Sequence, residues 1–134
     1  MLSNNQWGPP AWYFLHAITL NYPKNPTYND KMNYMNFFKS IGYVLPCPKC
    51  GMNYNKNIQE NPIDNHLNSR EDLIQWLINI HNNVNIELNK PSYYYNDMMY
   101  FLNNSKLYTF NTSLMIIIFV IVIVTSSNIY KKYK

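Results

Sequence analysis

The amino-acid sequence predicts an all-α fold, a small bundle of four or five helices. Apolar residues recur at intervals of three and four through most of residues 1–104, which is the period of a helix. Prolines and capping residues divide this pattern into segments, and no run alternates apolar and polar residues as a strand does. With 134 residues, 47% of them hydrophobic and 16% aromatic, the chain is long enough for one domain with a small core.

The first two predicted helices each present one apolar face. Pro9 and Pro10 suit the first turn of a helix that ends before Pro23, with a face made of Trp12, Leu15, His16 and Thr19. Asn29 or Asp30 is the expected cap of a second helix that runs to about Val44 and is stopped by Pro46. Its predicted core residues are Met32, Met35, Phe38 and Ile41.

Three further helices are expected. One starts at the two cysteines, with Pro48 in its first turn, and runs to about Gln59. The next opens with Ser69 and Asp72 as a weak capping box, ends near Asn89 before Pro91, and has a helical apolar series, Leu73, Trp76, Leu77, Ile80, Val84 and Leu88. A short helix around Asp97 to Asn103 completes the domain, which we place at residues 1–104.

The C-terminal segment differs from this body in composition. Residues 107–129 carry no charge, and their centre, Leu114 to Val124, is strictly apolar. Interfacial tyrosines and a basic tail at 130–134 are typical of the flanks of a membrane helix, so we predict a single-pass tail anchor. The body would then face the cytosol, and a virion membrane is one candidate for the membrane. A buried strand or core helix is the alternative.

The charge distribution and the N-terminal residues argue against a nucleic-acid-binding surface and against a secretory signal. The net charge of +4 depends on Lys131, Lys132 and Lys134, and the body has no stripe of basic residues among aromatics, so no nucleic-acid partner is expected. The first ten residues, MLSNNQWGPP, lack the charged and apolar regions of a secretory signal.

Cys47 and Cys50 are the only cysteines, and their C-x-x-C spacing has three readings. A structural disulfide would close a very small loop and constrain the unfolded chain little. Zinc would need two further ligands from the widely separated His16, His66 and His81. A redox pair fits best, because the N-terminus of a helix and a nearby lysine favour a thiolate.

A redox dithiol needs an electron acceptor, and flavin is the usual organic one. No G-x-G-x-x-G motif is present, so a Rossmann site is not expected. Trp12 and His16 are spaced i, i+4 on one helix, and the sequence HNNVN places His81, Asn82 and Asn85 on another. Such rings can sandwich an adenine, and amides can bind its edge. Each feature alone is also typical of a core helix.

Three segments together resemble the Erv/ALR family of FAD-linked sulfhydryl oxidases. They are WGPPAWYFLHAITLNYP, PCPKC and QWLINIHNNVNIELNKPSYY, in the family's order and spacing. The resemblance implies a helical bundle that binds FAD at its mouth and needs no metal. The positions that it implies for contact with FAD are Gly8, Trp12, His16, His81, Asn82, Asn85, Lys90 and Tyr93. The short chain and its composition are similar to oxidases of large cytoplasmic DNA viruses.

The resemblance also implies a reaction. A substrate thiolate would attack Cys47, Cys50 would leave beside the flavin, and electrons would pass through FAD to O2 with release of H2O2. His81 would pack and hydrogen-bond rather than act as a base, and Lys90 would stabilise negative charge near the flavin. Without a second dithiol, the chain would take electrons from a partner protein's dithiol or a thioredoxin-like carrier, and it is expected to be a homodimer. A zinc-binding, membrane-tethered adaptor and a membrane-tethered scaffold are the competing functions.

Overall fold

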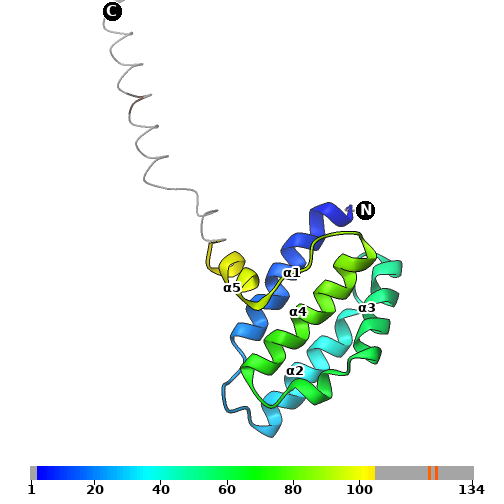
Figure 1. The fold of residues 1–134 in the computed structure, drawn as a ribbon, viewed down its shortest axis with the longest axis vertical. Helices are drawn as coiled ribbons and strands as arrows, with labels where there is room; N and C mark the ends of the chain where they lie inside the picture. The colour runs from blue at the N-terminus through cyan, green and yellow to red at the C-terminus, as the bar shows by residue number, and fades with distance from the viewer. Residues whose placement is uncertain (1–2, 105–120, 122, 124–134) are drawn as a thin grey trace, which may run out of the picture. The chain divides into compact units, whose positions relative to one another are not determined.

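The computed structural model describes residues 3–104, Ile121 and Ile123. Residues 3–104 are all-helical, as the sequence predicts. The elements are α1 (Asn4–Leu20), α2 (Tyr28–Ile41), α3 (Pro48–Glu60), the short 3₁₀ helix η1 (Ile63–His66), α4 (Arg70–Glu87) and α5 (Tyr95–Asn104). The central helix is α4, which packs against α1 on one side and α3 on the other (Figure 1).

The core of the bundle forms around α4 because this helix has apolar residues on several faces. Its side chains Leu73, Trp76, Leu77 and Ile80 are fully buried, as predicted. They meet Leu15 of α1 and Phe38 and Ile41 of α2 in one cluster. On another side of α4, Ile74 and Ile78 pack against Met98 and Leu102 of α5. Leu88, predicted for this face, is 57% exposed, because it follows the last residue of the helix as its C-cap.

Three buried polar side chains tie the helices to the loops between them. Tyr22 donates its hydroxyl to the Leu67 carbonyl at 2.9 Å, and Trp76 donates its indole N–H to the Asn61 carbonyl at 2.8 Å. The hydroxyl of Tyr54 on α3 donates to the Phe38 carbonyl of α2 at 3.0 Å, and burial raises the pKa of this phenol. Each of these three donors is therefore satisfied, which fixes the loops that carry Leu67 and Asn61 and joins α3 to α2.

Two predicted helix starts are wrong. Helix α1 begins at Asn4 rather than at the prolines, because Ser3 and Gln6 form a capping box one turn earlier. Pro9 and Pro10 lie in its second turn and are exposed. Proline has no backbone N–H, so the carbonyls four residues earlier lose their helical donors, and water can satisfy them at this exposed position. Helix α2 is capped by Thr27, with Asp30 as the reciprocal capping-box residue, and it ends at Ile41, three residues before the expected Val44.

The predicted cap at Ser69 and the predicted helix start at the cysteines are confirmed. Ser69 accepts the backbone N–H of Asp72 at 3.1 Å at the start of α4. Cys47 is the N-cap of α3, and Pro48 is its first residue. Sequence rules for helix ends succeed here because Pro48 directly follows Cys47, and Asp72 and the apolar series from Leu73 follow Ser69 within about one turn.

The end of α2 and the first turn of α3 approach each other closely, at Gly42 before the two cysteines and at Gly51 after them. A Cβ on Gly51, the fourth residue of α3, would overlap the carbonyl oxygen of Gly42, which follows α2. The space at Gly42 is filled in turn by the Asn55 side chain. Glycine is required at Gly51 because the obstacle is backbone, which cannot rotate away. This contact anchors the first turn of α3, where the cysteines lie.

The predicted membrane segment at 107–129 and the basic tail at 130–134 lie outside the described residues, apart from Ile121 and Ile123. Among the residues that are described, no helix combines the length and the apolar character needed to span a bilayer. The tail anchor therefore stays a prediction from sequence.

Candidate active site

Cys47 and Cys50 form a disulfide at the N-terminus of α3, with their Cα atoms 5.1 Å apart. The backbone N–H of Cys50 donates to the Cys47 sulfur at 3.2 Å, so this sulfur takes the place of a capping oxygen. Both residues are half-buried and are flanked by exposed Pro46, Pro48 and Lys49. A disulfide in this position is reachable by another protein, and a thiolate formed there lies at the positive end of the helix dipole.

The first turn of α1 contacts this disulfide. The side-chain amide of Asn4 donates to the Cys50 sulfur at 3.6 Å, although 46 residues separate the two in sequence. Asn4 is followed at four-residue steps by Gly8, Trp12 and His16, which form one ridge along α1. The ridge is about 18 Å long at the rise of an α-helix. It runs from the disulfide at one end to a buried histidine at the other.

At the far end of the ridge, aromatic rings from α1 and α4 form a cluster. Trp12 stacks on His81 with ring centroids 4.0 Å apart and an angle of 8° between the planes. His81 also contacts the ring of Tyr93 at 5.5 Å, and its Nδ1 lies 3.1 Å from Nε2 of His16. The sequence predicts these four residues as one group, and the structure brings them together. Trp12 and His81 contact each other directly, so a nucleotide ring would lie against the cluster rather than between this pair.

Burial keeps both histidines of the cluster neutral. Burial, together with the nearby His81, lowers the pKa of His16 to about 3. Burial, together with the charge of Lys90, lowers the pKa of His81 to about 4. One ring therefore donates and the other accepts in the bond between them at neutral pH. These pKa values agree with the predicted packing role of His81, since a base for neutral pH needs a higher pKa.

Asn82 fixes the segment after α4 by a two-way hydrogen bond. Its amide nitrogen donates to the Tyr93 carbonyl, and its amide oxygen accepts the Tyr93 backbone N–H, both at 2.8 Å. This pair fixes Tyr93 beside His81. The side chain of Asn82, predicted to contact the cofactor, is thus occupied with backbone, and it acts by placing Tyr93.

Asn85 and Lys90 lie at the C-terminal end of α4. The Asn85 carbonyl accepts the Lys90 backbone N–H at 2.8 Å, across a turn in which Asn89 has a φ of 52°. Asn85 is 5% exposed, and its side-chain Nδ2 has no hydrogen-bond partner in the described part of the chain. Lys90 is exposed, and its charge reaches His81. The turn therefore holds the backbone of Lys90 against the end of α4, and the lysine charge acts on His81.

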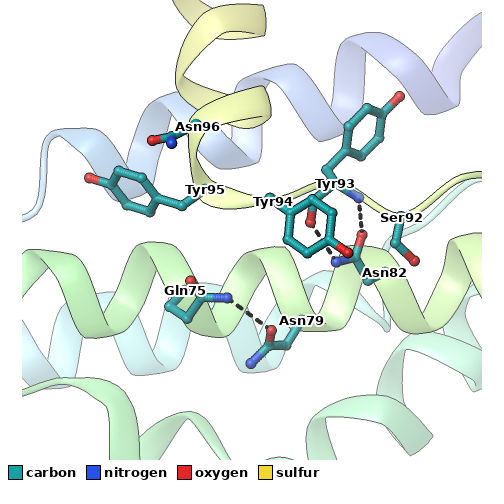
Figure 2. A pocket seen from close by; sticks show the side chains of 8 residues that line it. All are labelled: Gln75, Asn79, Asn82, Ser92, Tyr93, Tyr94, Tyr95 and Asn96. Carbon is teal, nitrogen blue, oxygen red and sulfur yellow. Dashed lines mark hydrogen bonds between the residues drawn. The ribbon is translucent and has the colours of Figure 1, made fainter.

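A pocket of about 450 Å³ lies where the segment after α4 crosses that helix (Figure 2). Its walls are amides and tyrosines: Gln75, Asn79, Asn82, Ser92, Tyr93, Tyr94, Tyr95 and Asn96. The volume is in the range of small-molecule sites, about 300–1,000 Å³. The pocket shares Asn82 and Tyr93 with the predicted site residues, and it includes neither cysteine nor the α1 ridge.

The described residues do not support a zinc site. Among residues 3–104 no group of three or more His, Cys, Asp or Glu side chains is placed to hold a metal ion. His66 instead pairs with Asn61 at 3.1 Å, and both cysteine sulfurs are in the disulfide. His16 and His81 bond to each other.

The predicted positions fit a flavin nucleotide by three independent observations. His16 Nδ1 and Asn85 Nδ2 are two of four buried side-chain atoms without a partner among the described residues, and a bound polar group would satisfy them. A Cβ at Gly8 would meet no atom within 4 Å, which leaves open space midway along the α1 ridge.

Asn4, which precedes the WGPP motif, was not predicted from the sequence as a site residue. The sequence feature that could have identified Asn4 is its spacing of four residues from Gly8, which places both residues on one face of a helix.

Comparison with solved structures defines the class of fold. The chain superposes on the crystal structure of the FAD binding domain of Erv1 from Saccharomyces cerevisiae with a TM-score of 0.71 and 30% identity, over 76% of this chain and 95% of that one. The yeast Erv1 core gives a TM-score of 0.67 at 30% identity, over 83% of this chain and 87% of that one. The fold is therefore that of an Erv1-type FAD-binding helical domain.

Sequence comparison then gives the family. The Erv1 / Alr family profile matches residues 9–104, and the chain belongs to this family. A probable FAD-linked sulfhydryl oxidase of Acanthamoeba polyphaga mimivirus is 51% identical over 85 residues, 63% of this chain and 59% of that protein. The mitochondrial FAD-linked sulfhydryl oxidase ERV1 of Saccharomyces cerevisiae is 34% identical over 88 residues, 66% of this chain and 46% of that protein. The chain thus spans about half of these relatives' lengths.

Proposed function

We propose that this protein is an FAD-linked sulfhydryl oxidase, which forms disulfide bonds in dithiol-containing protein substrates. The observation that carries the proposal is the contact between the Cys47–Cys50 disulfide and α1 at Asn4. The same helix presents Gly8, Trp12 and His16 to the cofactor side, so one rigid element connects the dithiol to the cofactor positions. The names of the mimiviral and yeast relatives support the same activity.

The cofactor would be held by the ridge on α1 and by the end of α4. Trp12 and Tyr93 offer ring surfaces, and His16 and Asn85 offer the buried polar atoms that lack partners. Lys90 supplies a positive charge for a phosphate or a reduced ring system. FAD, when bound, accepts two electrons from the reduced cysteine pair and delivers them to an acceptor, for which O2 is the candidate.

The cysteine chemistry is thiol–disulfide exchange. A substrate thiolate attacks the Cys47 sulfur, so a substrate–Cys47 bond forms and the Cys47–Cys50 bond breaks. The electron pair of the broken bond leaves with Cys50 as a thiolate. The second substrate thiolate then attacks the substrate sulfur of the mixed disulfide and releases Cys47. The substrate loses two electrons, and the cysteine pair gains them.

Oxygen consumption tests this function. The purified full-length protein should oxidise a reduced protein dithiol, consume O2 and release an equal amount of H2O2. The Cys47→Ser variant should retain FAD and lose this turnover, because it cannot receive substrate electrons. Failure of the wild-type, flavin-loaded protein to oxidise any dithiol while O2 is present would reject the proposal.

Two further elements of the proposal rest on the sequence alone. They are a homodimer, and a tail anchor at 107–129 that keeps the oxidase body on the cytosolic side. The apolar residues of α2 do not by themselves favour the homodimer, because Phe38 and Ile41 are buried in the protein's own core and the half-buried Met35 and Phe37 pack against it. Protease added to intact membranes should digest the body that contains Cys47. Full protection of that body would contradict this orientation.

A further inference from the structure

We propose that Asn4 is a positioning residue that directs exchange by stabilising Cys50, rather than Cys47, as the leaving thiolate. The inference rests on the proposed function, since it assumes that the disulfide is opened by a substrate thiolate. It assigns a role to a residue that lies before the segment matched by the family profile, residues 9–104.

The orientation of the Asn4 amide is set by a second contact. Trp7 donates its indole N–H to the Asn4 oxygen at 3.2 Å. An indole N–H is only a donor, so the oxygen of the amide must face Trp7 and its NH₂ group must face the Cys50 sulfur, 3.6 Å away. Trp7 and Asn4 are one helical turn apart on α1. The helix thus presents a fixed N–H donor to one sulfur of the disulfide.

The two sulfurs have different donors. The sulfur of Cys47, the N-cap of α3, accepts the backbone N–H of Cys50. A backbone N–H at a helix N-terminus usually favours the first cysteine of a C-x-x-C pair as the thiolate. Asn4 supplies a competing donor to Cys50 from another helix. A hydrogen bond to a charged acceptor is about twice as strong as one to a neutral acceptor, so the Asn4 contact strengthens when Cys50 becomes a thiolate.

The consequence is a direction for the exchange. A thiolate that attacks Cys47 expels Cys50, and a better-stabilised leaving thiolate leaves faster. The electron pair of the broken bond stays on the Cys50 sulfur, facing the Asn4 N–H, while Cys47 carries the mixed disulfide with the substrate. Loss of the Asn4 donor should shift the balance toward a Cys47 thiolate and slow productive opening.

The test measures the reactivity of Cys50 directly, without flavin turnover or oxygen. In the full-length Cys47→Ser variant, Cys50 is the only cysteine, and its alkylation by iodoacetamide across pH reports its thiolate fraction. Adding Asn4→Ala should lower the alkylation rate at neutral pH about threefold to tenfold. Adding Asn4→Asp should lower it further, because a carboxylate would then face the thiolate.

Asn4→Asp also separates this role from a structural one. Asn4 is the first residue of α1, where an acidic side chain favours the helix, so this variant should keep or raise the melting temperature. Asn5→Asp is the matched control, since it adds the same charge to the same turn. Its alkylation rate should change by less than that of Asn4→Asp.

Equal alkylation curves for the Cys47→Ser protein with and without the Asn4 substitutions would overturn the inference. An Asn5→Asp substitution that lowers the Cys50 alkylation rate as much as Asn4→Asp does would also overturn it. Either result leaves the oxidase proposal standing if the wild type oxidises dithiols. A protein that lacks flavin and turnover but shows the Asn4 effect would reject the oxidase function and retain the electrostatic role.

Discussion

His16 Nε2 and His81 Nδ1 lie 3.1 Å apart, which joins α1 to α4 by two imidazoles that are 1% and 9% exposed. One ring must donate and the other accept, so protonation of both would place two donors against each other. The bond between the two helices that carry most of the candidate cofactor positions therefore depends on neutral histidines.

Acidification should weaken the fold in a definite window. The folded-state pKa values, about 3 for His16 and about 4 for His81, lie below the ordinary value of 6.5. The unfolded chain therefore binds more protons below pH 6.5, and stability is full above that pH and falls as pH drops toward the folded values. Between its folded and unfolded pKa values, each ring should contribute up to about 1.4 kcal/mol per pH unit.

The measurement is the melting temperature between pH 7 and pH 5, above the range in which Asp30 and Asp64 titrate with their lowered pKa values. The wild type should lose stability over this interval. His81→Gln should show a smaller loss over the same interval, because one of the two titrating rings is gone. Identical pH slopes for the two proteins would show that the imidazoles are not the cause.

Removing a residue predicted to contribute to the cofactor site should weaken FAD binding. His81→Ala and Asn85→Ala should each lower the fraction of protein purified with flavin and lower the melting temperature, and added FAD should restore part of it. FAD at 100 times its Kd stabilises by about 2.7 kcal/mol. Asn83→Ala, on the same helix, is the matched control. Stoichiometric flavin and unchanged melting in both test variants would make this helix a core element only.

The two cysteines should not be equivalent. Cys50→Ser should leave FAD bound but separated from any thiolate, whereas Cys47→Ser leaves a Cys50 thiolate beside the flavin. Both variants should lose dithiol oxidation. Only Cys47→Ser should show a long-wavelength thiolate–flavin absorption band, and the appearance of that band in Cys50→Ser instead would reverse the assignment of the two sulfurs.

Two glycines should respond in opposite ways to alanine. Gly51→Ala places a Cβ against the Gly42 carbonyl, so we expect destabilisation of about 1–3 kcal/mol, measured by denaturant unfolding. Gly8→Ala meets no atom of the protein and should stabilise the flavin-free form by about 0.5–1 kcal/mol. If FAD lies against the α1 ridge, Gly8→Ala should also weaken FAD binding, and unchanged binding would place the cofactor elsewhere.

Local patterns predicted most of the fold. The apolar series of α4 and the caps at Cys47 and Ser69 are encoded within a single turn or helix face, so the sequence alone specified them. The starts of α1 and α2 were missed because a cap several residues upstream competed with a proline or an asparagine nearby. In both cases a local capping box, Ser3 with Gln6 or Thr27 with Asp30, sets the helix start, and the proline or asparagine was the weaker local signal.

The residues predicted for the candidate site include Trp12, His16, His81 and Tyr93, which the structure brings together, but the geometry of their contacts was not predicted. Their contact with FAD stays a prediction. Its residue types identified the ring cluster, since tryptophan and histidine at helical spacing suit a flat cofactor. The use of the Asn82 side chain on the Tyr93 backbone and the Asn4 contact to Cys50 both bridge separate segments. Periodicity within one helix carries no information on such contacts.

The most direct test of the central claim is an anaerobic titration of the purified full-length protein with a reduced dithiol, followed by its visible spectrum. We predict an oxidised-flavin spectrum that is bleached by stoichiometric dithiol and returns when O2 is admitted, with no bleaching in Cys47→Ser. A colourless protein, or flavin bleached equally well in Cys47→Ser, would contradict a route from substrate through the Cys47–Cys50 pair to FAD.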